Sequence, residues 1–234
     1  MFTSESLRFS VVIPAKNEAE NLPQLVQEIT RRFAGERFEI VIVDDGSTDA
    51  TAAVVRELAA QNPQLRYVLN EQSSGKSAAI LTGVCAAEAP MIVTLDADGQ
   101  NDPRNIEQLL RLAQEPGVGL AAAQRIKHAH SARKQFSSRL ANQLRSLLLN
   151  DQTRDSACGL KAFPREVFLR LPHFENMHRF LPALVLREGL AIRHLEVADR
   201  PRLYGRSKYG LFDRTIAGVV DLFGVWWLLR RRMQ

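Results

Sequence analysis

Short apolar runs alternate with helix-like segments through the first half of the chain. The apolar runs have the length of strands, and they cover residues 9–13, 38–43, 65–69 and 91–95. The segments between and after them have helical spacing or helix-starting residues, and they cover residues 21–33, 48–60, 77–87 and 102–112. Asp102 is expected to cap the last of these helices, because Pro103 suits the first helical position. This alternation predicts a doubly wound α/β fold, with a mostly parallel sheet flanked by helices.

The composition is that of an ordinary globular domain, with 234 residues of which 45% are hydrophobic and 24% charged. It excludes a fibrous, collagen-like or disordered chain. Two cysteines, Cys85 and Cys158, are too few for a disulfide framework or a four-cysteine zinc site, so we expect a reducing compartment. The first residues lack the apolar stretch of a secretory signal, and the stretch 215–229 is interrupted by Asp221. We therefore expect a cytoplasmic protein without a membrane span.

Positive charge is concentrated in two segments. Residues 200–234 hold eight Lys or Arg and two Asp, and residues 125–145 hold six Lys or Arg and no acid, whereas the whole chain carries +5. Such patches suit a phosphorylated substrate, an anionic membrane or nucleic acid, and a solvated helix face would also explain the first of them. Aromatic residues make up 7% of the chain and do not interleave with the basic runs, which argues against nucleic acid.

Two aspartates follow the strand expected at 91–95. Ligands of doubly wound sheets bind beyond the carboxyl ends of the strands. An extended backbone would aim Asp96, Asp98 and Gln100 to the same side of the chain. The repulsion between the two carboxylates is relieved if Mg²⁺ or Mn²⁺ lies between them and completes its shell with substrate phosphates. The pattern therefore predicts a metal and diphosphate site, and a pair of solvated loop aspartates is the alternative.

A second acidic pair, Asp44 and Asp45, ends the strand expected at 38–43. Acidic side chains at such a strand end accept hydrogen bonds from the ribose or base of a nucleotide. Gly46 follows them and suits a tight turn, so plain turn chemistry is the alternative reading.

Two familiar nucleotide motifs are incomplete. The segment 117–122 spells G-x-G-x-x-A, but it runs into a strand-like segment instead of opening a helix after a strand. Gly75, Lys76 and Ser77 follow a strand and open a helix as a P-loop does, but Asn70 stands at the position of the first P-loop glycine. Lys76 can still reach a phosphate. His128 and His130 have no accompanying metal ligands, so we expect them to extend the basic surface.

Six segments stand in a fixed order along residues 9–210. They are Val12-Ile13-Pro14-Ala15-Lys16-Asn17-Glu18, Val43-Asp44-Asp45-Gly46-Ser47, Asp96-Ala97-Asp98-Gly99-Gln100, Arg125, Asp155-Ser156-Ala157-Cys158-Gly159 and Arg202-Leu203-Tyr204-Gly205-Arg206-Ser207-Lys208. They resemble the motifs of the GT-A (Rossmann-like) family 2 glycosyltransferases, in particular the dolichyl- or polyprenyl-phosphate sugar synthase branch. Each motif is weak alone, but their shared order makes the resemblance strong.

The resemblance assigns roles by position. It implies that the nucleotide sugar is bound by Pro14, Ala15, Asn17, Glu18, Asp44, Asp45, Asp96 and Gln100. We expect Lys76 to join this set, because its position lets it reach a phosphate. It implies metal ligands at Asp96, Asp98 and Gln100, and acceptor-phosphate contacts at Arg125 and Arg139. It further implies that Arg202 and Lys208 close over the diphosphate and join Asp96, Asp98 and Arg125 as catalytic residues.

Two positions depart from the family pattern. Lys16 stands where the family often has an aromatic residue, which leaves the identity of the nucleotide base open. Cys158 stands where serine is common.

The last segment reads as an amphipathic helix. Apolar residues recur at 212, 216, 219, 220, 223, 226 and 227. Trp226 and Trp227 precede three arginines, a mixture typical of helices at an anionic membrane surface, and a helix packed on the domain's own core is the alternative. We thus expect a glycosyltransferase domain at 1–210 and a basic membrane-interface helix at 211–234.

The resemblance implies an inverting, metal-dependent glycosyltransferase that moves one sugar from a nucleotide diphosphate sugar to a polyprenyl phosphate at the inner membrane face. GDP-mannose is the first donor expected and a UDP-sugar the second. A hydroxyl acceptor on a glycan or lipid is the chief alternative. A non-catalytic subunit and a nucleic-acid-binding protein are more distant readings, and an integral membrane partner is compatible with the main one.

Overall fold

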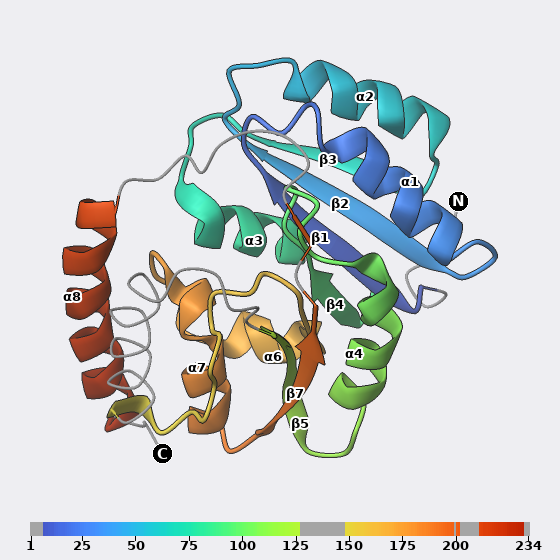
Figure 1. Ribbon diagram of the computed structural model, residues 1–234. Helices are drawn as coiled ribbons and strands as arrows, with labels where there is room; N and C mark the ends of the chain where they lie inside the picture. Colours follow the sequence, from blue (N-terminus) through green and yellow to red (C-terminus); the bar gives the residue numbers. More distant parts are fainter. Residues whose placement is uncertain (1–6, 127–147, 199, 202–210, 232–234) are drawn as a thin grey trace.

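The protein is a three-layer α/β/α structure (Figure 1). The computed structural model describes residues 7–126, 148–198, 200–201 and 211–231, with the backbone alone for 211–219. The strands are β1 (Phe9–Ala15), β2 (Phe38–Asp45), β3 (Leu65–Asn70), β4 (Met91–Thr94), β5 (Val118–Arg125), β6 (Lys161–Pro164) and β7 (Ala191–Val197). The helices are α1 (Leu22–Arg32), α2 (Thr51–Gln61), α3 (Gly75–Ala86), α4 (Ile106–Ala113), α6 (Arg165–Arg170), α7 (Leu181–Arg187) and α8 (Leu211–Leu229). Two 3-10 turns are η2 (Pro103–Asn105) and η3 (Met177–Arg179).

These strands form one seven-stranded sheet in the order β3-β2-β1-β4-β6-β5-β7. The pairs β1–β2, β1–β4, β2–β3 and β5–β7 are parallel, whereas β6 runs antiparallel to both β4 and β5. The predicted mostly parallel sheet is therefore confirmed. Because β6 is reversed, its first residue, Lys161, lies at the same edge of the sheet as the last residues of its neighbours.

Helices cover both faces of the sheet, and each face has its own apolar core. On one face α1, α2 and α4 bury apolar residues in a single core together with a cluster of aromatic rings, with α2 over β2 and β3 and α4 over β5 and β6. In that cluster the ring centroids of Phe9, Phe33 and Phe38 lie between 5.0 and 5.7 Å apart. On the other face, α3, α6, α7 and α8 pack around a core that includes Phe163 and Phe168.

The C-terminal half of helix α8 packs against the second core (Figure 1). Val225 is buried, and Leu222 and Trp226 pack against the second core. Asn176 Nδ2 also donates a hydrogen bond of 3.1 Å to Asp221 Oδ2. The inner side of this helix therefore packs on the domain's own core, which is one of the two interpretations expected for the segment.

The eight elements expected in the first half are all present, with ends shifted by at most three residues when η2 is counted together with α4. Asp102 accepts a hydrogen bond from the backbone N–H of Arg104, so it caps η2 as expected, and α4 follows directly. The segment 117–122 runs into β5, which agrees with its exclusion as a dinucleotide motif. None of the helices in the described ranges is both long and apolar enough to cross a membrane.

Candidate active site

The parallel strands deliver their carboxyl ends to one edge of the sheet, and most of the predicted site residues lie there. β1 leads into Asn17 and Glu18, β2 ends at Asp45, and β4 leads into Asp96. β5 ends at Arg125 on the other side of β6. Segments distant in sequence are therefore brought together at this edge by the strand order alone.

The central contact of the site is an ion pair between Lys76 and Asp96. Lys76 Nζ lies 2.5 Å from Asp96 Oδ1, and the two side chains are 28% and 27% exposed. Lys76 comes from the first turn of α3, whereas Asp96 follows β4. The structure thus places a cation on the first aspartate of the predicted metal motif, at a position that solvent still reaches.

Gly159 leaves the space that the Asp96 carboxylate fills. A Cβ atom built on Gly159 would lie 2.1 Å from Asp96 Oδ1 and 2.5 Å from Oδ2, far inside van der Waals contact. Gly159 is itself held because its carbonyl accepts a hydrogen bond of 2.6 Å from Thr94 Oγ1. Only glycine fits beside this carboxylate without moving it.

The oxygen ligands offered by the protein suit a divalent cation whose coordination shell is completed by the substrate. Within the described residues, no three His, Cys, Asp or Glu side chains gather as a metal centre. Asp96 and Asp98 are instead the acidic residues of one short loop, and Gly159 provides the cradle for the first of them. Mg²⁺ is commonly held by one or two carboxylates together with substrate phosphates and water. The residues present fit such a metal.

Gln100 is tied to the segment that follows β7. Its backbone N–H donates to Asp98 Oδ1 at 3.2 Å, and its carbonyl accepts from the backbone N–H of Arg200 at 3.1 Å. The Arg200 guanidinium in turn binds Asp102 at 2.8 Å and Glu28 of α1 at 2.7 Å. Arg200 therefore joins the predicted metal loop to α1 and to the chain that leads toward residue 202.

Asp45 holds the loop that precedes α3. Its carboxylate accepts four hydrogen bonds of 2.8 to 3.2 Å, from the side chains of Asn70 and Ser73 and the backbone N–H groups of Ser74 and Gly75. Burial would raise the pKa of Asp45, but these hydrogen bonds outweigh it and lower the pKa below its usual value. Asp45 stays ionised and fixes this loop, which brings Lys76 to Asp96.

The turn after β2 requires its glycine. Gly46 has φ +67°, and an added Cβ would meet the Ser73 backbone nitrogen at 2.9 Å. Lys16 reaches the same loop, because its Nζ donates to Ser73 Oγ at 2.7 Å. Lys16 thus helps to hold the loop that Asp45 binds.

The loops after β1 and β2 are joined by hydrogen bonds. One of them runs from the Glu18 backbone N–H to Thr51 Oγ1 at 2.9 Å. Asp44 accepts from the Ser47 backbone N–H at 2.8 Å and from the Tyr67 hydroxyl at 3.0 Å. Asn17 has φ +53°, and its Oδ1 accepts from the Thr48 backbone N–H at 2.7 Å. Other residues of the predicted nucleotide set lie beside them: Pro14 and Ala15 end β1 and pair in register with Val43 and Asp44. The structure brings this set together as predicted, and its binding role stays a prediction.

Arg125, the predicted contact of the acceptor phosphate, is held by the loop before β6. Its guanidinium makes two hydrogen bonds to Asp155, whose side chain is 9% exposed. Below this loop, the Lys161 ammonium is buried and donates to the carbonyl oxygens of Ser156 and Cys158. Burial lowers the pKa of Lys161 to about 8. A buried cation therefore shapes the loop that carries both Asp155 and Gly159.

Three predicted site residues, Arg139, Arg202 and Lys208, lie outside the described residues, and so do His128 and His130. Sequence reasoning did not single out Lys161, Arg200 or Glu28. Arg200 counted only as part of a basic segment, and Lys161 as an ordinary charged residue. The contacts of Arg200 with Glu28 and of Lys161 with the loop 155–159 depend on the tertiary fold, although Lys161 at the start of an apolar stretch was a weak signal.

Two solved glycosyltransferases share this fold. The glucosyl-3-phosphoglycerate synthase of Mycobacterium tuberculosis, solved with Mn²⁺, UDP and glucosyl-3-phosphoglycerate, matches 97% of this chain and 81% of that chain, with a TM-score of 0.69 and 20% identity. A mannosyltransferase from Pyrobaculum calidifontis, solved with GDP-mannose and Mn²⁺, matches 99% of this chain and 67% of that chain, with a TM-score of 0.71 and 20% identity. At this identity the likeness establishes the fold, and the expected GT-A architecture is confirmed.

Comparison of sequences identifies the family as well as the fold. A dodecaprenyl-phosphate galacturonate synthase from Rhizobium johnstonii is 30% identical over 232 residues, which are 97% of this chain and 68% of that protein. An undecaprenyl-phosphate 4-deoxy-4-formamido-L-arabinose transferase from Proteus mirabilis is 31% identical over 227 residues, 95% of this chain and 69% of that protein. The family model for glycosyl transferase family 2 matches residues 10–171. The chain therefore belongs to glycosyl transferase family 2.

Proposed function

We propose that this protein transfers one sugar from a nucleotide diphosphate sugar to the phosphate of a polyprenyl phosphate, with Mg²⁺ or Mn²⁺ as cofactor. The observation that carries the proposal is the pair of relatives that match nearly the whole chain. Their names share a polyprenyl-phosphate acceptor and differ in the sugar. The acceptor class is therefore the property we transfer to this chain, while the sugar stays open.

The arrangement of charges supports a reaction between two anions. Lys76 and Asp96 stand at the end of β4, and Arg125 stands two strands away in the order β4-β6-β5. A divalent cation on Asp96 and Asp98 would stabilise the negative charge that develops on the departing nucleoside diphosphate. Arg125 offers a fork-shaped donor suited to the oxygens of the acceptor phosphate. The site thus separates a donor side from an acceptor side.

A phosphate acceptor explains why the site needs no general base. A phosphate oxygen is already ionised near neutral pH, so no proton has to be removed before it attacks the anomeric carbon. Catalysis then depends on holding the two substrates in line and on stabilising the leaving group. In-line displacement by this oxygen forms the new C–O bond as the bond to the nucleoside diphosphate breaks, and it inverts the anomeric configuration.

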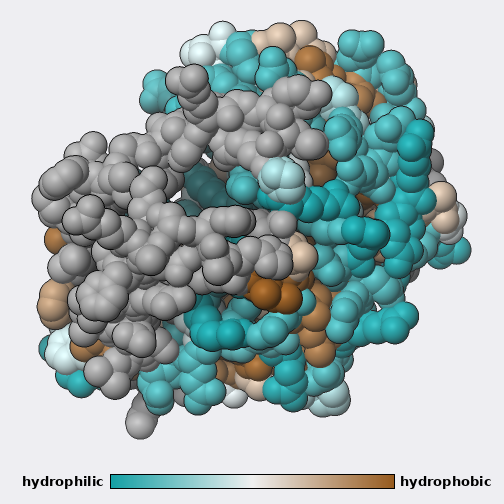
Figure 2. Space-filling model, viewed as in Figure 1, coloured by the Kyte–Doolittle hydropathy of each residue, from teal (hydrophilic) through white to brown (hydrophobic). Residues whose placement is uncertain are grey.

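The outer side of α8 supports a location at the membrane surface. Val220, Phe223 and Trp227 follow helical spacing and are 66%, 57% and 53% exposed. Helix α8 lies at the left of the view in Figure 1, and some hydrophobic atoms are visible along the left edge of Figure 2 beside the grey ones. A helix with an apolar outer side and basic residues at its end suits the headgroup region of an anionic membrane.

Two arginines follow the last residue of α8. The Cζ atom of Arg231 lies 4.8 Å from the ring centroid of Trp227 on the outer side, whereas the Cζ atom of Arg230 lies 3.7 Å from that of Trp226, which packs against the second core. The Arg231–Trp227 pair combines an exposed aromatic ring suited to the interface with a cation that attracts anionic lipids. We propose that α8 rests on the inner face of the membrane, where a lipid-linked phosphate is presented to the site.

The direct test uses the purified protein, undecaprenyl phosphate and a panel of labelled donors that includes GDP-mannose, UDP-glucose and a UDP-uronic acid. We expect one donor to label the organic phase in the presence of Mg²⁺ or Mn²⁺, and we expect EDTA or the Asp98→Ala substitution to abolish the label. Metal-dependent nucleotide binding without lipid labelling by any donor would contradict the proposed acceptor and would favour a hydroxyl acceptor.

A further inference from the structure

We propose that Lys76 is an exchangeable counter-ion for Asp96: it neutralises this carboxylate in the metal-free protein, yields it to the divalent cation, and then binds the donor diphosphate. The inference deepens the proposed function, on which its last step rests. It predicts opposite effects of Lys76 on two binding events. The ammonium weakens the binding of metal alone, and it strengthens the binding of the nucleoside diphosphate once the metal is present.

The ion pair has the geometry of a competitor for metal. Lys76 Nζ binds Asp96 Oδ1 at 2.5 Å, the same carboxylate that the metal motif offers to a cation. The backbone of Gly159 flanks this carboxylate, because even a Cβ at that position would collide with both oxygens. A cation that binds Asp96 must therefore share or displace the ammonium.

Partial exposure makes the exchange feasible. About three quarters of each side chain is covered, with exposed fractions of 28% for Lys76 and 27% for Asp96. A fully buried pair would leave an unpaired buried charge when it separates, which is strongly unfavourable. Solvent reaches both partners here, so Lys76 can leave Asp96 without that penalty.

The position of Lys76 on α3 favours a phosphate as its second partner. The backbone before it is fixed by two hydrogen bonds from Ser74 and Gly75 to Asp45, and the residue after it, Ser77, is fixed by a bond of 2.7 Å to the His178 ring. The ammonium thus moves while the backbone stays in place. It also lies in the first turn of a twelve-residue helix, where the helix dipole favours an anion.

The test measures metal binding by the full chain in the absence of nucleotide and acceptor. Free Mn²⁺ is titrated against wild type, Lys76→Met and Asp96→Asn, with electron paramagnetic resonance reporting unbound metal. We expect Lys76→Met to bind Mn²⁺ about five-fold more tightly, since a competing ion pair that solvent still reaches is modest in strength. Asp96→Asn should bind Mn²⁺ at least about ten-fold more weakly, because it removes a metal ligand.

Two further variants separate this effect from a general loss of charge or structure. Arg111→Met also removes one positive charge, from the exposed side of α4 where Arg111 pairs with Glu107, and it should leave Mn²⁺ affinity within about two-fold of wild type. Lys76→Arg keeps the positive charge, and its Mn²⁺ affinity should stay close to that of wild type. Thermal melts of all variants identify any that fail to fold.

The second arm titrates UDP and GDP at saturating Mn²⁺. Lys76→Met should now bind the nucleotide that the enzyme prefers about ten-fold more weakly, the reverse of its effect on metal alone. Unchanged or weaker Mn²⁺ binding by Lys76→Met would overturn the exchange. That outcome is distinguishable from failure of the proposed function, because metal titration needs no acceptor and lipid labelling is measured separately.

Discussion

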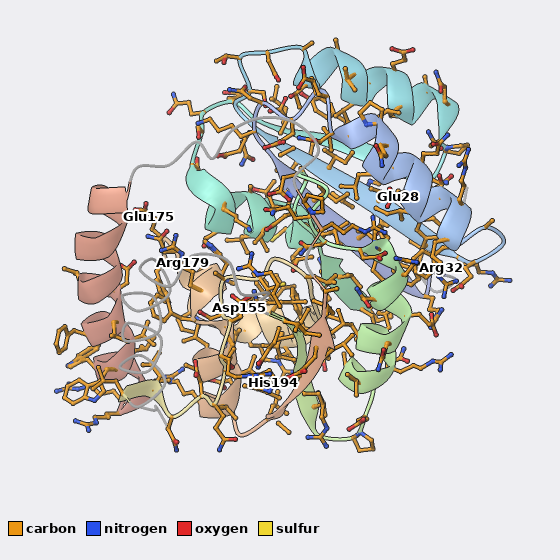
Figure 3. All side chains as sticks on the ribbon, viewed as in Figure 1. Glu28, Arg32, Asp155, Glu175, Arg179 and His194 are labelled. Atoms are coloured by element: carbon orange, nitrogen blue, oxygen red, sulfur yellow. The ribbon has the colours of Figure 1, made fainter. Side chains whose placement is uncertain are left out.

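Arg125 and Asp155 form a two-pronged ion pair, in which Arg125 Nε lies 2.6 Å from Asp155 Oδ2 and Nη2 lies 3.2 Å from Oδ1. The pair joins the end of β5 to the loop before β6, near the centre of the molecule where Figure 3 labels Asp155. Burial would raise the pKa of Asp155, but the hydrogen bonds and charge of Arg125, with the charge of Lys161, outweigh it and lower the pKa. Asp155 is therefore ionised at neutral pH and orients Arg125.

Asp155→Asn tests whether this orientation serves the acceptor. The amide keeps the shape of the side chain but removes the charge that aligns the Arg125 guanidinium. We expect kcat/KM for polyprenyl phosphate to fall at least about ten-fold, because small misplacements of a positioning group are costly, while the Kd of the nucleotide changes little. Steady-state kinetics in acceptor, together with calorimetric titration of nucleotide, measure the two effects. An equal fall in kcat/KM for polyprenyl phosphate and in nucleotide affinity would contradict a role of Arg125 in binding the acceptor.

Gly159→Ala tests the cradle of Asp96. The added Cβ meets the far end of a flexible side chain, so the Asp96 carboxylate moves aside and the fold survives. We expect Mn²⁺ affinity and transfer to fall at least about ten-fold, with a change in the free energy of unfolding of about 1 kcal/mol or less. Gly224→Ala is the matched control, because a Cβ on Gly224 meets nothing within 4 Å. Normal Mn²⁺ binding by Gly159→Ala would contradict the role of Gly159 in positioning the Asp96 carboxylate for metal.

Lys161 makes a pH-dependent contribution to stability. Burial lowers its folded-state pKa to about 8, against 10.5 for an ordinary lysine. Between these two values the unfolded chain binds a proton that the folded chain does not, so folding becomes more favourable as pH rises, by up to about 1.4 kcal/mol per pH unit. Lys161→Met removes this effect.

The free energy of unfolding of wild type, measured by urea melts at pH 7.5, 8.5 and 9.5, should therefore rise relative to that of Lys161→Met. The largest change is expected between pH 8.5 and 9.5, inside the window set by the two pKa values. A difference that stays constant across this range would mean that the ammonium of Lys161 is stabilised as well in the fold as in water.

The outer side of α8 should determine membrane binding without determining stability. Replacing both Phe223 and Trp227 with serine removes two side chains that are more than half exposed. Burial of such side chains in an interface is worth roughly 1.5–3 kcal/mol each, so the affinity for vesicles of anionic phospholipid should fall at least about ten-fold, with thermal melts unchanged. Leu69→Ser, at 49% exposure on β3, is the control. Undiminished vesicle sedimentation of the double variant would exclude α8 as the contact.

Sequence patterns predicted the first half of the fold closely, because each parallel strand there is a continuous apolar run. They did not predict β6, which has four residues and includes Pro164, or the short helices α6 and α7. Local periodicity is too weak over such lengths to separate strand from loop. The reversed direction of β6 is set by its pairing with β4 and β5, which no local pattern records.

In the candidate site, too, local sequence patterns predicted some features, whereas others depend on contacts between distant residues. The location of Asp96, Asp98 and Gln100 at this edge was predictable, because strand ends of a parallel sheet meet there. The extended backbone expected for them is wrong, since the chain turns at residues 97–99 and Gly99 has φ +74°. The ion pair of Arg200 with Glu28 joins residues 172 positions apart, and the contacts of Lys161 depend on the turn at 155–159. Asp45 was expected to face the nucleotide, and its role in fixing the loop 70–75 depends on tertiary packing. Contacts between residues so far apart in the sequence cannot be predicted until the fold is known.

The choice of acceptor tests the central claim most directly. The purified protein, its preferred labelled donor and Mn²⁺ are incubated in parallel with undecaprenyl phosphate, undecaprenol and a soluble sugar acceptor, and the released nucleoside diphosphate is quantified with the labelled product. We predict one nucleoside diphosphate for each glycosylated lipid phosphate, and no transfer to either hydroxyl acceptor. Transfer to undecaprenol or to the sugar at a rate equal to or above that for undecaprenyl phosphate would contradict a polyprenyl-phosphate sugar transferase.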